Sequence, residues 1–489
     1  MPGVVVSTSV RTGPSGAGEV AAAQWFAAGI TERGPIDAPT LIRSLSEYKT
    51  YYGDYETGNL YTYVQTFFEE GGDRAYVYRV TGANASAGFL DIVDELAVDT
   101  LRVTAANAGD WSANVGIEVV AGDTADTFKV KVYLSSVLLY TSRDLVTPAD
   151  AVGVLNTSSV SHLIVVTDLG SVSAAPDNNA AVLAQVALSA GYDGDSIVTG
   201  DYTTGLDEFA YDLGPGAVSI PGQTGAATWG ALIDHGAANH RIALCAFTET
   251  ETVATAKTAI AAMYSDPEAD YAGFYFPWVE IPDPATSGLV LTQSPEACVA
   301  AARAKAITAT GPWAPGAGLI SEASFVSGLV EYINTATSDG LDEKRINGLR
   351  KIGNTIRVYG ARSASADEAN WYFLTNRDTV NVIAWNAEDR LEDHVFSTID
   401  ARGALFSRIE ATLIGLLDPM RLAGGLYEAF DVDGNLVDPG YSVEVSDVIN
   451  PVVDLAQGKV SAIVNVRVSA VGDKISVTIT KSNLTTSVV

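Results

Sequence analysis

The hydrophobic and polar positions of this chain follow helical spacing in some segments and strict alternation in others. Residues 61–70 have helical spacing and end at a glycine pair, which is a common way for a helix to stop. An alternating strand follows at once and ends at Arg79 and Val80. A second short alternating strand, residues 357–359, ends at Gly360. These changes of period predict a protein that mixes helices with strands.

The pattern changes again in the middle of the chain. Residues 101–139 are rich in strand-forming residues, and residues 128–133 alternate cleanly, which predicts a separate β domain. Residues 199–315 then combine buried apolar runs with helical spacing, as is typical of an α/β unit. In this unit we expect strands at residues 242–247 and 273–276, and helices at residues 228–238, 251–264 and 295–308.

The last third begins with a helical region, residues 387–417, whose apolar side chains share one face. We expect Gly403 to split this region and Pro419 to end it, because proline interrupts a helix. The shared face consists of Leu391, Val395, Ile399, Phe406, Ile409, Leu413 and Leu416. Strands are then expected at residues 427–430, 441–445, 459–469 and 474–480, with a tight turn at Asp433 and Gly434.

The composition indicates a large soluble protein. With 489 residues, the chain exceeds the size at which one core keeps growing, so we expect two to four domains. Its formal net charge is −30, because it has 59 aspartate and glutamate residues and only 29 lysine and arginine residues. This negative field repels phosphate backbones and anionic lipids, which argues against nucleic acid or a membrane as the main partner.

Targeting segments and disulfides are not expected either. The start of the chain has no basic segment followed by an apolar core, and its most apolar run, residues 21–30, is short and broken by Gln24. We therefore expect neither a signal peptide nor a transmembrane helix. Cys245 lies in a strand-like run and Cys298 in an alanine-rich helical run, so we expect both to be buried and reduced.

Each candidate for chemistry has a stronger structural explanation. Residues 431–435 resemble the start of a calcium loop, but their glycine comes two places early, so a hairpin turn is favoured. We expect His235 and His240 to be a surface pair at a helix end rather than zinc ligands. Residues 13–19 have phosphate-loop spacing but carry Glu19 where lysine is required. We therefore expect no catalytic residue, no cofactor and no metal site.

Two segments far apart in the chain carry a family resemblance. The first contains Phe67, Phe68, Gly71, Gly72, Arg79 and Val80, and the second contains Ile356, Arg357, Val358, Tyr359, Gly360, Ala361 and Arg362. In this order they resemble motifs of the contractile tail sheath proteins. Ser112 and Ala113 stand where that family usually has glycine. Six further segments are similar to turns of the family and occur in the same order, namely residues 1–6, 34–39, 105–117, 219–222, 275–278 and 311–316.

The resemblance implies a particular domain plan. The fold class would be α+β multidomain, with a discontinuous α/β core domain near the tail tube, terminal β arms, an inserted β-rich domain and an inserted α/β domain. The expected parts are an N-terminal linking arm (1–20), the core sheath domain (21–85 plus 321–425), the β-rich domain (86–198), the inserted α/β domain (199–320), and C-terminal strands with a linking arm (426–489).

The resemblance also implies a structural role and no enzymatic one. Copies would stack as hexameric rings in a helical sheath, which contracts to drive an inner tail tube through the target cell envelope. The implied partners are further copies of the chain, the tail tube protein, and the baseplate and tail terminator proteins. Neither nucleic acid binding nor membrane insertion is implied. The implied location is the virion tail, assembled in the host cytoplasm.

Two groups of residues are expected to carry this role. The β-prone terminal arms cannot bury a face alone, and the resemblance implies that they complete a sheet in neighbouring copies. The subunit-linking residues would be Val4, Val5, Val6, Ile475, Val477 and Ile479. The tube-facing residues would be Arg408, Leu413, Leu417 and Arg421, and the two arginines would pair with acidic groups on the tube.

Two rival functions stay open at this point. A non-contractile surface or adhesin-type structural protein would need a secretion signal, and we see none in the first residues. An α/β hydrolase or dehydrogenase built on residues 199–315 would need a nucleophile elbow or a complete glycine-rich dinucleotide loop, and we find neither motif in the sequence.

Overall fold

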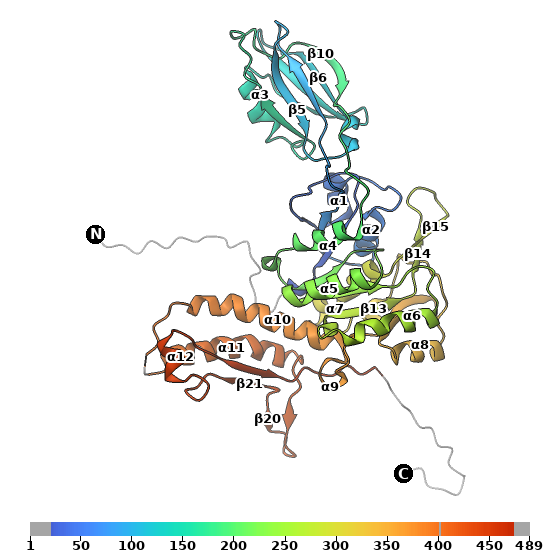
Figure 1. Ribbon diagram of the computed structural model, residues 1–489, viewed down its shortest axis with the longest axis vertical. Coiled ribbons are helices and arrows are strands. Elements are labelled where there is room, and N and C mark those ends of the chain that lie inside the picture. The colour runs from blue at the N-terminus through green and yellow to red at the C-terminus, as the bar shows by residue number, and fades with distance from the viewer. Residues whose placement is uncertain (1–20, 401, 474–489) are drawn as a thin grey trace.

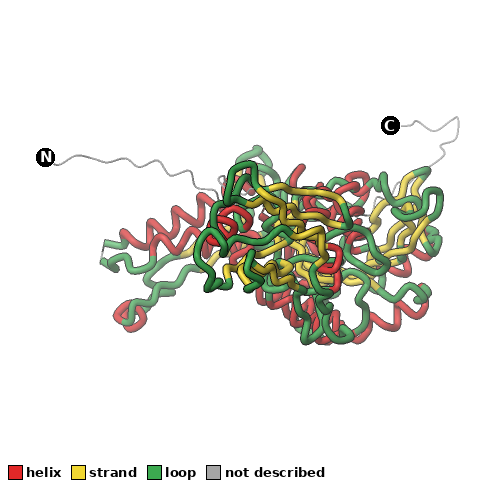
Figure 2. Tube along the Cα trace, turned by 90° about the horizontal axis from the view of Figure 1, so that it is seen from above, coloured by secondary structure: helices red, strands yellow, loops and turns green. Residues whose placement is uncertain are grey.

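The computed structural model describes residues 21–400 and 402–473. The molecule is elongated and has a β-rich part at one end, an α/β core in the middle and a C-terminal lobe at the other end (Figure 1). Seen from above, the long helices of the lobe extend to one side of the core (Figure 2). Several separate sheets combine with helices, so the predicted α+β multidomain class is confirmed.

The core is built on an eight-stranded sheet with the strand order β18-β17-β13-β12-β11-β1-β3-β2. Neighbouring strands from β17 to β3 run parallel, whereas the edge strands β18 and β2 run antiparallel to their neighbours. The strands are β1 (Trp25–Gly29), β2 (Thr40–Ile42), β3 (Ala75–Arg79), β11 (Gly216–Ser219), β12 (Arg241–Ala246), β13 (Ala272–Phe276), β17 (Ile346–Ile352) and β18 (Thr355–Tyr359).

Helices cover both faces of this sheet, as its continuous apolar strands require. Successive side chains point to opposite faces, so Trp25 and Ala27 pack in one hydrophobic cluster while Phe26 and Ala28 pack in the other. The first face is covered by α1 (Leu45–Tyr52), α2 (Tyr61–Glu69) and α7 (Glu296–Ala309). The second face is covered by α4 (Thr199–Asp207), α5 (Ala226–Asn239), α6 (Val253–Ala259) and α8 (Thr335–Asp342).

Shorter elements complete the core. The strands β15 (Val290–Gln293), β14 (Val279–Pro282) and β16 (Gly328–Leu329) form a small antiparallel sheet in that order. Short 3₁₀ helices connect the longer elements, namely η1 (Ala21–Ala23), η3 (Tyr211–Leu213), η4 (Ile260–Ser265), η5 (Ala269–Tyr271) and η6 (Gly318–Ser321).

The main sheet corrects one part of the predicted domain plan. The sequence interpretation placed residues 199–320 in a separate inserted domain, but β11, β12 and β13 of this segment lie in the middle of the sheet, between β17 and β1. Parallel strands are joined by long crossovers, so neighbours in a sheet can be far apart in sequence. Hydrophobic periodicity identifies each strand but contains no information on its neighbours.

The β-rich part consists of two antiparallel sheets that share one hydrophobic core. One sheet has the order β4-β5-β9 and the other β10-β6-β7-β8. The strands are β4 (Phe89–Val93), β5 (Asp99–Ala105), β6 (Val115–Ala121), β7 (Phe128–Leu134), β8 (Val137–Thr141), β9 (Ile164–Asp168) and β10 (Leu183–Ala187), with α3 (Pro148–Leu155) and η2 (Asp110–Asn114). Two stretches of chain join this part to the core, and the bonds of Ser86 N to Tyr192 O and Tyr192 N to Ser86 O (2.9 and 2.8 Å) hold them side by side.

The C-terminal lobe packs two long helices against a two-stranded antiparallel sheet. The helices are α10 (Leu374–Leu391) and α11 (Ala404–Leu422), and the sheet pairs β21 (Tyr441–Glu444) with β22 (Ile463–Val466). Smaller elements surround them, namely α9 (Glu368–Trp371), η7 (Glu392–His394), the hairpin of β19 (Ala429–Phe430) and β20 (Leu436–Asp438), and α12 (Val452–Ala456). The predicted turn at Gly434 is confirmed, because it connects β19 to β20.

The lobe corrects the predicted end of its second helix. The predicted helical region is interrupted, but the break is wider than Gly403, because α10 ends at Leu391 and residues 395–400 are not helical. Val395 and Ile399 therefore do not share a helix face with the leucines of α11, although the sequence interpretation expected them to. Gly403 directly precedes α11, and its φ of 70° is one that glycine adopts without strain. Pro419, however, lies inside α11, which continues to Leu422. The turn after the proline is held by bonds from Ala423 N to Pro419 O (3.0 Å) and from Gly425 N to Met420 O (2.9 Å). One missing N–H donor therefore does not end this helix.

Two further side-chain predictions can be checked in the core. Cys245 and Cys298 are buried and free, as predicted. His235 is not part of a surface pair, because only 7% of it is exposed and its Nε2 lies 2.9 Å from Nη1 of Arg241. Burial, together with the neighbouring Arg241, lowers the pKa of His235 to about 3. This histidine is therefore a neutral residue of the core.

Candidate functional site

The sheet of β21 and β22 offers open strand edges. Within the described residues it has only these two strands, so each of them has one edge without a strand partner. One face is closed, because Val443 and Val464 pack against the cluster of Leu405, Ile409 and Leu413 on α11. A strand edge with free N–H and C=O groups is a template for pairing with another chain.

The start of the described chain is held by a buried arginine of α7. Arg303 Nη1 donates to the carbonyl oxygen of Ala22 at 2.5 Å, and Arg303 Nε donates to Asp378 Oδ2 at 2.8 Å. Both charged side chains are 8% exposed. Burial raises the pKa of Asp378, and the adjacent guanidinium opposes this effect. Asp378 belongs to α10, so one arginine ties the N-terminal end, the core and the lobe together.

The end of the described chain is held by a second buried arginine. Arg362 Nε lies 2.7 Å from Asp342 Oδ1, its Nη2 lies 2.9 Å from Asp342 Oδ2, and its Nη2 also donates to Asp473. The guanidinium carbon lies 4.0 Å from the ring centre of Tyr372 and 4.8 Å from that of Phe373. Carboxylates and aromatic faces are the partners that arginine prefers.

The predicted linking residues belong to the two terminal segments of the chain. Val4, Val5, Val6, Ile475, Val477 and Ile479 all lie outside the described residues. Their assignment stays a prediction. Ala22 and Asp473, near the two ends of the described part, are held by Arg303 and Arg362.

The predicted tube-facing row needs a correction. Leu413 and Leu417 are 2% and 0% exposed, because they belong to the hydrophobic clusters that α11 forms with the rest of the lobe. Arg421 is also engaged, with Nε 3.0 Å from Asp418 Oδ1 and Nη1 2.7 Å from Glu428 Oε1. Arg408 is exposed. Helical spacing identifies an apolar face but does not say whether the same chain covers it.

The first sequence motif contains a structural anchor that sequence reasoning missed. Glu70, directly before the glycine pair, is 3% exposed and accepts bonds from the N–H groups of Ser324, Phe325 and Val326 at 2.8 to 3.1 Å. The following Gly72 is required because an added Cβ would lie 2.4 Å from the Phe67 ring. The motif therefore joins α2 to a segment more than 250 residues later.

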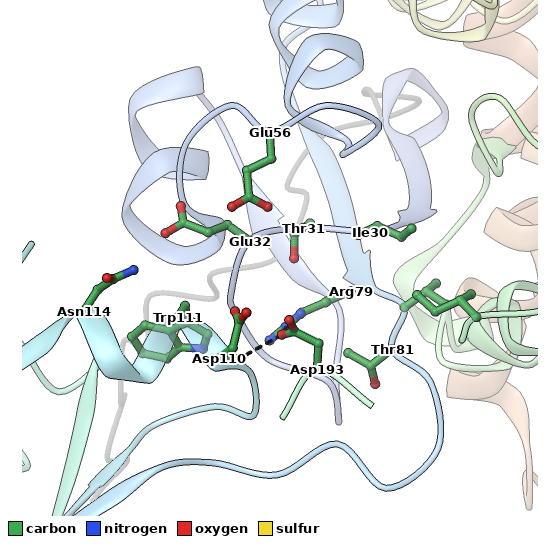
Figure 3. A pocket seen from close by; sticks show the side chains of 12 residues that line it. Ile30, Thr31, Glu32, Glu56, Arg79, Thr81, Asp110, Trp111, Asn114 and Asp193 are labelled. Carbon is green, nitrogen blue, oxygen red and sulfur yellow. Dashed lines mark hydrogen bonds and ion pairs between the residues drawn. The ribbon is translucent and has the colours of Figure 1, made fainter. Parts of the chain in front are cut away.

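A cleft of about 160 Å³ lies where the core meets the β-rich part (Figure 3). Arg79, at the end of β3, donates to Ala108 O at 2.6 Å and lies 3.3 Å from Asp193 Oδ1, so it ties the two parts together. Burial and the nearby Asp110 raise the pKa of Asp193. In the described ranges, no three His, Cys, Asp or Glu side chains are grouped so that they could hold a metal ion. The side chains that line the cleft include Arg79, which joins the core to the β-rich part.

The helices give no sign of a membrane span. Among residues 21–400 and 402–473, no helix combines the length and the apolar run that crossing a bilayer requires.

Comparison with known proteins gives likeness in structure only. No protein-family model and no curated protein matches the sequence. The helical sheath of the anti-feeding prophage in its contracted state is 15% identical with a TM-score of 0.57, and the match covers 98% of this chain and 99% of that chain. The sheath of an extracellular contractile injection system in its contracted state is 16% identical with a TM-score of 0.53, covering 99% and 98%. A sheath tail protein from Listeria innocua is 13% identical with a TM-score of 0.60, covering 90% and 91%. The chain therefore has the fold of the tail sheath proteins.

Proposed function

We propose that this chain is a structural, non-enzymatic subunit of a contractile tail sheath. It polymerises around a tail tube and contracts to drive the tube through the target cell envelope. The observation that carries the proposal is the likeness in fold over nearly the whole length, 98% of this chain and 99% of the other, to a subunit solved within a helical sheath. Another relative was solved in a baseplate.

The proposed partners follow from the same likeness. They are further copies of the chain in stacked hexameric rings, the tail tube protein, and the baseplate and tail terminator proteins. The proposed location is the tail of the particle, assembled in the host cytoplasm. A heterologous contact that repeats without closing generates an open helix, and two packings of different free energy allow that helix to change length.

The terminal arms are the proposed links between copies. The sheet of β21 and β22 has two strands, which is fewer than an independently stable sheet needs, and its outer edges have no strand partner in the described part of the chain. Residues 4–10 and 474–480, from neighbouring copies, would extend this sheet by backbone hydrogen bonds. Backbone hydrogen bonds of this kind can persist when neighbouring subunits rotate relative to one another, whereas flat side-chain contacts would be broken.

The proposed tube contact is the exposed side of α11. Arg408, Gly415 and Leu422 lie on this side, and Leu422 is 75% exposed. Arg408 would pair with an acidic group of the tube, whereas Arg421 is already neutralised by Asp418 and Glu428. A rim pair of this kind makes association sensitive to salt and adds little affinity.

The test is electron microscopy of the purified full chain in negative stain, alone and with tail tubes. We expect striated tubes that widen and shorten. Deletion of residues 1–18 should leave a folded subunit that no longer polymerises, whereas Arg408→Glu should polymerise alone but fail to coat tubes. Compact monomers at high concentration would refute the sheath function, and contracting sheaths from the truncated chain would refute the arm links alone.

A further inference from the structure

Both ends of the described chain meet the core beside a buried arginine. Arg303 donates to the carbonyl oxygen of Ala22, and Arg362 donates to the carboxylate of Asp473. We infer that Arg362 is a positioning residue, which fixes the point and direction in which the C-terminal linking arm leaves its own subunit. The inference rests on the proposed function, because it assigns an anchor to an arm that links subunits.

The environment of Arg362 makes it a rigid anchor. Its side chain is 3% exposed and is held by Asp342 and by the rings of Tyr372 and Phe373. Its backbone is held as well, because Arg362 N donates to Asn347 Oδ1 at 2.6 Å and Asn347 Nδ2 donates to Arg362 O at 3.0 Å. A guanidinium that is already fixed loses little freedom when it binds another carboxylate.

The second carboxylate comes from a partly exposed residue at the end of the described chain. Asp473 lies 111 positions after Arg362 in the sequence, and its side chain is 36% exposed. Asp342 already supplies one counter-charge to the guanidinium through two contacts. Asp473 is therefore placed to restrain the chain that follows it rather than to neutralise the arginine.

The bond between Arg362 and Asp473 reduces the number of residues whose backbone must become fixed when two subunits link. The preceding fixed point is Ser469, whose N–H donates to Gly425 O at 2.9 Å. Without the bond to Arg362, the residues from Ala470 to Asp473 have no side-chain anchor to their own subunit. Fixing the backbone of one residue costs roughly a factor of ten in an equilibrium constant. Release of these residues should therefore weaken the link between subunits by at least about tenfold.

The test compares two matched carboxylate changes in the full chain. Asp473→Asn removes the anchor, and Asp91→Asn removes a similar exposed partner of an arginine, Arg102, in the β-rich part. We expect Asp473→Asn to unfold at the wild-type temperature but to need at least about tenfold more protein to polymerise. Asp473→Glu should restore most of the polymerisation, and Asp91→Asn should polymerise like the wild type.

A measurement on the unassembled chain keeps the inference separate from the sheath function. The backbone at 470–473, followed by NMR relaxation, should be more mobile in Asp473→Asn than in the wild type and unchanged in Asp91→Asn. Wild-type polymerisation by Asp473→Asn, unchanged mobility at 470–473, or a loss of assembly that only follows a loss of thermal stability would each overturn the inference. Failure of the wild type to polymerise would refute the sheath function, and the relaxation measurement would still decide whether the anchor exists.

Discussion

Leu417→Ala tests whether the apolar residues of α11 stabilise the lobe or make the proposed contact with a tail tube. Leu417 is fully buried in the cluster that includes Ile383, Leu416, Met420 and Leu426. Truncation of such a leucine removes its burial and leaves a cavity, which together cost about 2–5 kcal/mol. Since 1.4 kcal/mol is a factor of ten, local opening of the lobe should become roughly 30-fold or more easier.

Hydrogen exchange of the α11 amides, followed by mass spectrometry at several pH values, measures this opening. The matched control is Leu422→Ala on the same helix, which should change stability by less than about 0.5 kcal/mol because Leu422 is 75% exposed. The reasoning fails if Leu417→Ala keeps wild-type exchange and loses only the ability to coat tubes. That pattern would mean that Leu417 faces the tube, as the sequence interpretation held.

Three further predictions concern the core and its joint with the β-rich part. Burial raises the pKa of Glu296 from 4.5 to about 7. The protonated side chain should therefore contribute its full stabilisation below pH 4.5, and this stabilisation should be lost as the pH rises to 7. In thermal unfolding scans, Glu296→Gln should remove this decline. Glu70→Gln should lower the free energy of unfolding by about 1.5–3 kcal/mol, because it removes the charge from bonds to three backbone amides, and an unchanged denaturation midpoint would contradict this role. Limited proteolysis should cut first near residues 80–88 and 189–198 and release the β-rich part intact, whereas early cuts between β11 and β13 would contradict the single main sheet.

The sequence predicted individual elements of this fold well. The apolar runs of β12 and β13 and the glycine stop after α2 are local signals, and the structure confirms them. The position of β11 to β13 beside β1 was not predictable in this way, because pairing of parallel strands depends on contacts across most of the chain. The assignment of residues 199–320 to a separate domain failed for this reason.

The candidate sites show the same limit. The motif that ends at Arg362 was identified in the sequence, but one carboxylate partner of this arginine lies 20 residues earlier and the other lies 111 residues later, so spacing could not reveal what the arginine binds. Leu413 and Leu417 were placed on the right face of their helix, yet the residues that cover this face come from α10 and from β21 and β22. Periodicity describes one element, whereas burial depends on the elements that pack against it.

The two connections to the β-rich part lie side by side, so this part could be replaced by another domain. Besides the bonds between Ser86 and Tyr192, the N–H of Asp195 donates to Ala83 O at 2.8 Å, so the chain leaves the core and returns to it at nearly the same place. A short turn or a foreign domain with adjacent termini could replace residues 86–192, provided that a new acceptor replaces Ala108 O as the partner of Arg79 at the end of β3. An assembled polymer of this chain would then display that graft once per subunit along its length.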